Sequence, residues 1–149
     1  FIIYLSLLFS FLTWGYFVPK FSKNVSDAIR LLKFGAPINL VVLAFIIYLG
    51  PKAGAFHWAF FAVSSVFLSL SQPAVGMAFS LSNAGKALTS FNLLLFIGAF
   101  ALQWIIGVII DLTMNLGFSE ISGFRFAMVF FLLTSLFSYL FFLIKNYKN

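Results

Sequence analysis

Charge and cysteine are both scarce in this sequence of 149 residues. Only 8% of the residues are charged, against about 25% in an average soluble domain. The absence of cysteine excludes a disulfide framework and thiolate or zinc–cysteine chemistry. The single histidine, His57, falls at the start of an apolar run, so neither an H-E-x-x-H motif nor a serine–histidine pair at depth is available. We therefore predict no enzyme, no catalytic residue, no metal and no cofactor.

The net charge of +6 does not indicate a nucleic-acid partner. The nine lysines and arginines are scattered singly between apolar runs, whereas a nucleic-acid surface clusters them on one face of a soluble fold. Hydrophobic residues make up 63% of the chain, and 23 residues are phenylalanine. A domain of this size buries only about 68–70% of its unfolded surface. The remaining apolar surface needs lipid as its solvent, so a bilayer is the predicted partner.

Long apolar runs are abundant, and each is long enough to span a bilayer. A hydrocarbon core of about 30 Å requires about 20 helical residues, and buried soluble strands would be only about 4–8 residues long. We predict an all-α, polytopic transmembrane bundle of five helices, which form one unit over residues 1–149. The predicted helices cover roughly 1–19, 31–50, 55–80, 88–112 and 124–144.

The basic residues between the runs predict an orientation. If the runs cross the membrane alternately, seven of the nine basic residues collect on one side and two on the other. The first set is Lys20, Lys23, Arg30, Lys33, Lys86, Lys145 and Lys148, and the second is Lys52 and Arg125. Cytoplasmic loops carry the excess of lysine and arginine. We therefore expect a multi-pass protein of the inner (plasma) membrane with a cytoplasmic C-terminus.

Polar residues within the third run recur at helical spacing. Ser65, Ser69, Gln72 and Gly76 are spaced four, three and four residues apart, which places them on one face of a helix at about 100° per residue. Pro73 removes a backbone donor in the middle of this helix. Polar, interrupted helices line substrate sites in transporters, so the four residues are candidates for a cavity lining. Close packing of small residues is the other interpretation of Ser and Gly.

The fourth run carries a second polar stripe. Asn92 and Gln103 are eleven residues apart and differ by only about 20° around a helix axis, and Gln103 falls near the centre of the predicted span. A place along a transport path and a structural hydrogen bond between helices both fit such amides. We assign structural roles to the remaining polar residues of the apolar runs, namely Asn39, Thr134, Ser135 and Ser138.

Residues 82–111 resemble a bacterial major facilitator superfamily transporter around its tenth and eleventh helices. The resemblance rests on Gly85-Lys86, Asn92, Gly98-Ala99, Gln103, and Gly107 with Asp111. It implies that the five helices correspond to helices eight to twelve of a twelve-helix transporter, which makes the chain part of a C-terminal half. The N-terminal half of the same transporter is then a missing partner. Gly76, Gly98 and Gly107 would permit helices to approach closely and slide.

The expected function is secondary active transport of a small solute by alternating access, as a symporter or an antiporter. Asp111 is the only acid inside a predicted span, and it lies near one end, so no residue is assigned to ion coupling. The alternative is a non-transporting binding or scaffold subunit of a larger membrane complex.

Overall fold

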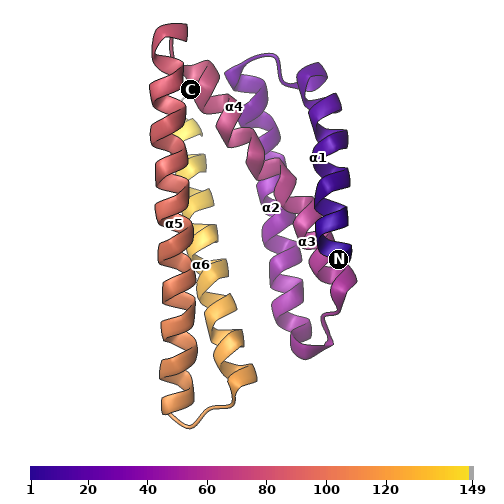
Figure 1. The fold of residues 1–149 in the computed structure, drawn as a ribbon, viewed down its shortest axis with the longest axis vertical. Helices are drawn as coiled ribbons and strands as arrows, with labels where there is room; N and C mark the ends of the chain where they lie inside the picture. Colours follow the sequence, from indigo (N-terminus) through magenta and orange to yellow (C-terminus); the bar gives the residue numbers. More distant parts are fainter. Residues whose placement is uncertain (148–149) are drawn as a thin grey trace.

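The computed structural model describes residues 1–147, and these residues form helices joined by short turns (Figure 1). The elements are α1 (Ile2–Phe21), α2 (Val25–Leu49), η1 (Gly50–Lys52), α3 (Ala55–Ser65), η2 (Val66–Leu70), α4 (Ser71–Ala78), α5 (Leu81–Asn115) and α6 (Glu120–Tyr147), where η marks a 3₁₀ helix. The all-helical prediction is confirmed for the described part. Four stretches are long and apolar enough to cross a membrane, and α1 adds a shorter apolar stretch, Ile2–Val18.

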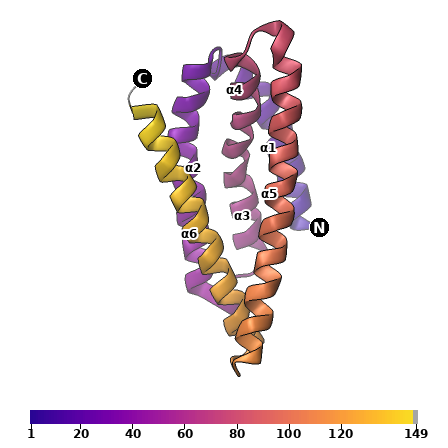
Figure 2. The same cartoon turned by 90° about the vertical axis from the view of Figure 1, so that its left-hand side faces the viewer.

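The helical rods run alternately in opposite directions (Figures 1 and 2). The α1–α2 turn, the α4–α5 turn and the end of α6 lie together at the top of Figure 1. This end carries the described members of the larger basic set, and Lys52 and Arg125 lie toward the opposite end. Lys148 lies outside the described residues. Successive rods therefore run in opposite directions, as the predicted orientation requires.

The second rod begins earlier than predicted. Asn24 caps α2 by accepting a hydrogen bond from the Asp27 backbone nitrogen (2.9 Å), and the Asp27 carboxylate accepts one from the Lys23 backbone nitrogen (3.1 Å). This reciprocal arrangement satisfies donors that a helix start otherwise leaves free. Residues 25–30, which lie before the predicted run of 31–50, are thus the first turns of the spanning helix.

The third rod is interrupted where its sequence is rich in serine. Four hydroxyl groups donate to carbonyl oxygens three residues back, from Ser64, Ser65, Ser69 and Ser71. Pro73 has no N–H for the carbonyl four residues earlier, and its ring crowds that carbonyl. Both effects favour i→i+3 geometry, and Val66–Leu70 form a 3₁₀ segment between α3 and α4. The interruption expected near Pro73 is therefore present, just before the proline.

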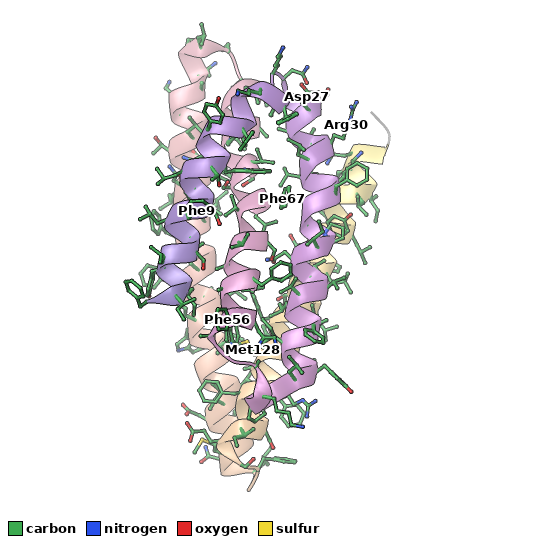
Figure 3. All side chains as sticks on the ribbon, turned by 90° about the vertical axis from the view of Figure 1, so that its right-hand side faces the viewer. Phe9, Asp27, Arg30, Phe56, Phe67 and Met128 are labelled. Atoms are coloured by element: carbon green, nitrogen blue, oxygen red, sulfur yellow. The ribbon has the colours of Figure 1, made fainter. Side chains whose placement is uncertain are left out.

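The best-packed part of the molecule lies between α2 and the third rod. Gly35 permits this contact, because a Cβ atom there would overlap the Phe67 side chain (Figure 3). On the other side of Phe67, the ring of Trp14 from α1 makes an edge-to-face contact at 4.7 Å between centroids. By contrast, α5 packs only along α4 and α6 and contains no buried residue.

A polar-lined cavity between the helices

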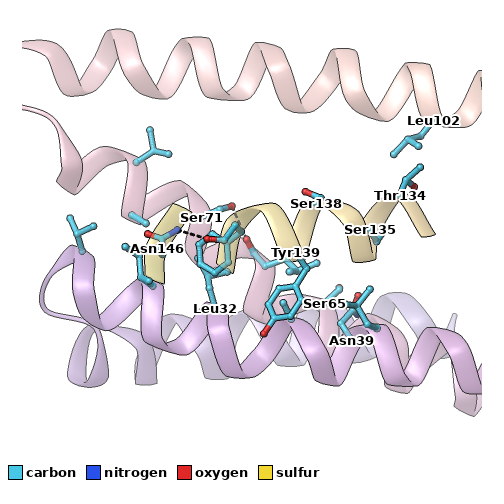
Figure 4. Close-up of a pocket in the computed structure, with 18 of the residues that line it drawn as sticks. Leu32, Asn39, Ser65, Ser71, Leu102, Thr134, Ser135, Ser138, Tyr139 and Asn146 are labelled. Atoms are coloured by element: carbon cyan, nitrogen blue, oxygen red, sulfur yellow. Dashed lines mark hydrogen bonds between the residues drawn. The ribbon is translucent and has the colours of Figure 1, made fainter. Parts of the chain in front are cut away.

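A cavity of about 860 Å³ lies between α2, the third rod, α5 and α6 (Figure 4). Its walls are largely apolar, with side chains such as Leu32, Leu68 and Leu102. The polar side chains in the lining are Asn39, Ser65, Ser71, Thr134, Ser135, Ser138, Tyr139 and Asn146. A mostly apolar pocket with a few convergent polar groups is the usual form of a small-molecule site.

The 3₁₀ segment decides which residues of the third rod face this cavity. A 3₁₀ helix turns about 120° per residue and an α-helix about 100°, so five residues shift the helix face by about 100°. Ser65, Leu68 and Ser71 line the cavity at steps of three, and Ala74, Val75 and Ala78 continue the lining along α4. The face therefore follows a period of three through η2 and returns to the α-helical period after it.

The structure separates the residues that the sequence grouped as cavity candidates. Ser65 lies in the cavity lining, whereas Ser69 is half-buried elsewhere and bonds to the Val66 carbonyl (2.6 Å). Gln72 is exposed at the start of α4, and it is not in the lining. On α5, Asn92 is half-buried and Gln103 exposed, and neither lines the cavity. The stripe of the third run assumed one continuous α-helix, and η2 breaks that assumption.

The three glycines predicted to allow close helix approach differ in what lies beside them. A Cβ on Gly76 would lie 3.6 Å from the Leu88 side chain of α5, so this glycine lies at a helix contact. Gly98 and Gly107 have open space beside them within the described residues. The tightest contacts occur at Gly35 and at Gly123, where a Cβ would come within 2.7 Å of the Thr113 hydroxyl. Sliding at Gly98 and Gly107 stays a prediction that needs a further helix.

The polar groups of the cavity mainly offer hydrogen-bond acceptors. The hydroxyl hydrogens of Ser65 and Ser71 are used in bonds to the Ala62 and Leu68 carbonyls (2.7 Å each). The Asn39 amide nitrogen donates to the Ser64 hydroxyl (2.9 Å) and to the Phe61 carbonyl (3.3 Å). A serine oxygen and the Asn39 side-chain oxygen retain lone pairs for a ligand.

Donors in the lining come from α6. Ser135 and Ser138 make no side-chain hydrogen bond to any other part of residues 1–147, so their hydroxyl groups can donate to a ligand. The three acids of the chain, Asp27, Asp111 and Glu120, are all outside the lining. The lining that the structure describes, which also contains no lysine or arginine, is therefore uncharged.

A second proline creates the main polar contact between α2 and α6. Pro37 lies inside α2 and has no N–H for the Lys33 carbonyl four residues earlier. The Tyr139 hydroxyl of α6 donates to this carbonyl at 2.9 Å. The Lys33 ammonium in turn donates to the Asn146 carbonyl at 3.0 Å. We call these two bonds the α2–α6 latch, and it adjoins the cavity because Tyr139 and Asn146 both belong to the lining.

Sequence reasoning missed the wall that α6 contributes. Thr134, Ser135 and Ser138 were assigned structural roles, but they face the cavity together with Tyr139. The Thr134 hydroxyl also bonds to the Phe130 carbonyl (3.1 Å), so a structural role holds there in part. The available signal was the spacing of Ser135, Ser138 and Tyr139, which share one helix face, together with the carbonyl freed by Pro37.

No protein-family model, curated protein or solved structure matches this chain. A function can therefore be inferred only from the cavity, the interrupted helix and the membrane-compatible helices.

Proposed function

We propose that the chain forms five helices of the C-terminal half of a secondary transporter of the major facilitator type, embedded in the inner membrane with its C-terminus in the cytoplasm. The solute is small, largely apolar, and carries hydrogen-bond donors that match the acceptor-rich lining. The positive-inside rule supports a cytoplasmic location for the end with the α1–α2 turn, the α4–α5 turn and the end of α6, because the described members of the larger basic set belong to it.

The cavity beside a broken helix is the observation that carries this proposal. Transporters bind substrates where discontinuous helices expose backbone and polar side chains near mid-membrane. Here the 3₁₀ interruption brings the side chains of Ser65, Leu68 and Ser71 to one side of the rod, where they line the cavity of about 860 Å³. The α2–α6 latch lies toward the end that we place in the cytoplasm (Figure 1). Breaking its two bonds would let α6 move away from α2 and open the cavity on that side.

The exposed surface of α5 supports the proposal that a second helical bundle packs against it. This helix has 35 residues, about 52 Å at 1.5 Å per residue, and none is buried. Gln103 is exposed within five residues of its midpoint, and an uncovered amide at that depth in hydrocarbon is costly. A second helical bundle of the same transporter would cover and bond this amide. Gln103→Leu should then weaken uptake more than membrane abundance, whereas burial by lipid alone would make the leucine variant neutral or better.

Uptake by cells that make the complete protein tests the proposal. A metabolite-uptake screen should find a solute whose entry is lost in Ser138→Leu and Ser71→Leu, which narrow the cavity from two walls, at unchanged membrane abundance. Ser26→Leu, at an exposed position in the first turn of α2 outside the cavity lining, is the matched control and should transport normally. Transport that survives both cavity variants would contradict the proposal.

The alternative is a non-transporting binding or scaffold subunit, favoured by the exposed apolar surface of α5. It predicts co-purifying partner subunits and no solute whose uptake depends on Ser138.

Orientation is tested by cysteine labelling, since the sequence has no native cysteine. A cysteine at Lys86 should react from the cytoplasm and one at Glu120 from outside, and the reverse pattern would overturn the orientation.

A further inference from the structure

A second cavity of about 460 Å³ lies at the opposite end of the bundle from the α2–α6 latch. Its walls come from the last turn of α2, η1, the start of α3 and the first turns of α6. The side chains that shape it are Ile46, Ile47, Trp58, Phe124, Arg125 and Met128. We call it the interfacial pocket.

The depth of the interfacial pocket indicates which layer of a membrane would surround it. Every lining residue lies within about three turns of a helix end, because α2 ends at Leu49, α3 begins at Ala55 and α6 begins at Glu120. In a spanning bundle, this level is the boundary between the hydrocarbon and the headgroups. Tryptophan is enriched at that boundary, and Trp58 stands half-buried in the pocket wall.

The chemistry of the pocket combines apolar walls with one cation. Arg125 is the charged side chain of the lining, and it is exposed. The stem of an arginine lies along apolar surface while its guanidinium reaches the headgroup level, where it can bind phosphate in a bidentate manner. Lys52, next to the lining residue Pro51, is also exposed and adds positive charge near the mouth. Glu120 is not in the lining.

We propose that the interfacial pocket binds an anionic phospholipid, with an acyl chain between Ile47, Phe124 and Met128 and the phosphate on Arg125. A free phosphate would use Arg125 alone and gain nothing from the apolar walls. A zwitterionic lipid would fill the same walls, but its own cation weakens the attraction to arginine. The site requires only that the chain lies in a membrane, so it stands independently of the transporter proposal.

Native mass spectrometry of the purified full-length protein tests this site. The probes are phosphatidylglycerol, phosphatidylcholine with the same acyl chains, and glycerol 3-phosphate as a headgroup without chains. We expect phosphatidylglycerol to be retained about tenfold more than phosphatidylcholine, because a charge-assisted bond is involved. Arg125→Gln should remove most of the preference, and Arg125→Lys should keep only part of it, because lysine binds phosphate as a point charge. Arg30→Gln, at the other end of the bundle (Figure 3), should change nothing.

A second variant tests the acyl-chain wall. Met128→Trp should reduce retention of both lipids, because the larger side chain occupies the pocket. Ile121→Trp, at an exposed position of the lining, provides the same test if Met128→Trp does not fold. Unchanged preference in Arg125→Gln, unchanged retention in both tryptophan variants, or equal competition by glycerol 3-phosphate would each overturn the proposal. A full-length protein that takes up neither lipid would show that polypeptide fills the pocket, which also overturns it.

Discussion

Two neighbouring rods each contain a proline, and the chain accommodates the two prolines differently. Around Pro37, α2 stays α-helical, and the freed Lys33 carbonyl receives a hydrogen bond from Tyr139 of another helix. Before Pro73, the third rod changes to a 3₁₀ helix, and serine hydroxyl groups bond to carbonyls of the same rod. The first solution ties two helices together, and the second rotates a helix face.

The difference follows from what each sequence offers near its proline. The third rod has serines at 64, 65, 69 and 71, and each can bond to a carbonyl one turn back. The residues before Pro37 include no serine or threonine between Asp27 and the proline, so the free carbonyl needs a donor from elsewhere. A local donor thus changes local geometry, and a distant donor creates a tertiary contact.

The largest expected effect on stability comes from the contact that joins α2 to the third rod. Gly35→Ala should destabilise the protein by about 1–3 kcal/mol, because the new methyl group overlaps Phe67 in a packed core. Thermal unfolding in detergent measures this loss. Gly15→Ala in α1 is the control: its Cβ has open space, so it should be neutral or stabilising by about 0.5–1 kcal/mol. Adding Phe67→Leu should recover part of the Gly35→Ala loss, and an equal loss in both backgrounds would exclude the overlap as its cause.

A smaller effect on stability is expected at the buried hydrogen bond between α2 and the third rod. Asn39 is 7% exposed and donates to Ser64 of α3. Asn39→Leu should cost about 0.5–1.5 kcal/mol, the usual net value of one such hydrogen bond. Ser64→Ala should have a comparable effect, and the double variant should be less destabilised than the sum of the two. Strict additivity would mean that the bond contributes nothing.

The smallest stability effect is expected for the proline-dependent bond of α6. Tyr139→Phe should cost about 0.6 kcal/mol, an average value for a hydrogen bond between membrane helices. In a Pro37→Ala background, the new backbone N–H can bond to the Lys33 carbonyl, so the loss of the hydroxyl should cost much less. The double-mutant cycle gives this coupling directly. The same cost in both backgrounds would show that Tyr139 does not compensate for Pro37.

The sequence predicted the five rods and their alternation, because run length and the spacing of basic residues are local signals. It also predicted that the third rod breaks near Pro73. It did not predict the direction in which Ser69 and Gln72 point, since that depends on the helical pitch of residues 66–70. The bond between Tyr139 and Lys33 was beyond reach as well, because it joins positions 106 residues apart and requires α2 and α6 to be neighbours.

The 3₁₀ segment orients the side chains of Ser65, Leu68 and Ser71 toward one cavity, and we expect water to reach all three. Single cysteines placed along residues 64–71 of this cysteine-free sequence test it, with a water-soluble maleimide as the reagent in the complete, membrane-embedded protein. We expect high reactivity at positions 65, 68 and 71, and low reactivity at Ser69 and at Leu70, which is 1% exposed. High reactivity at 65 and 69 with an unreactive 68 would instead show an unbroken α-helix without a 3₁₀ segment.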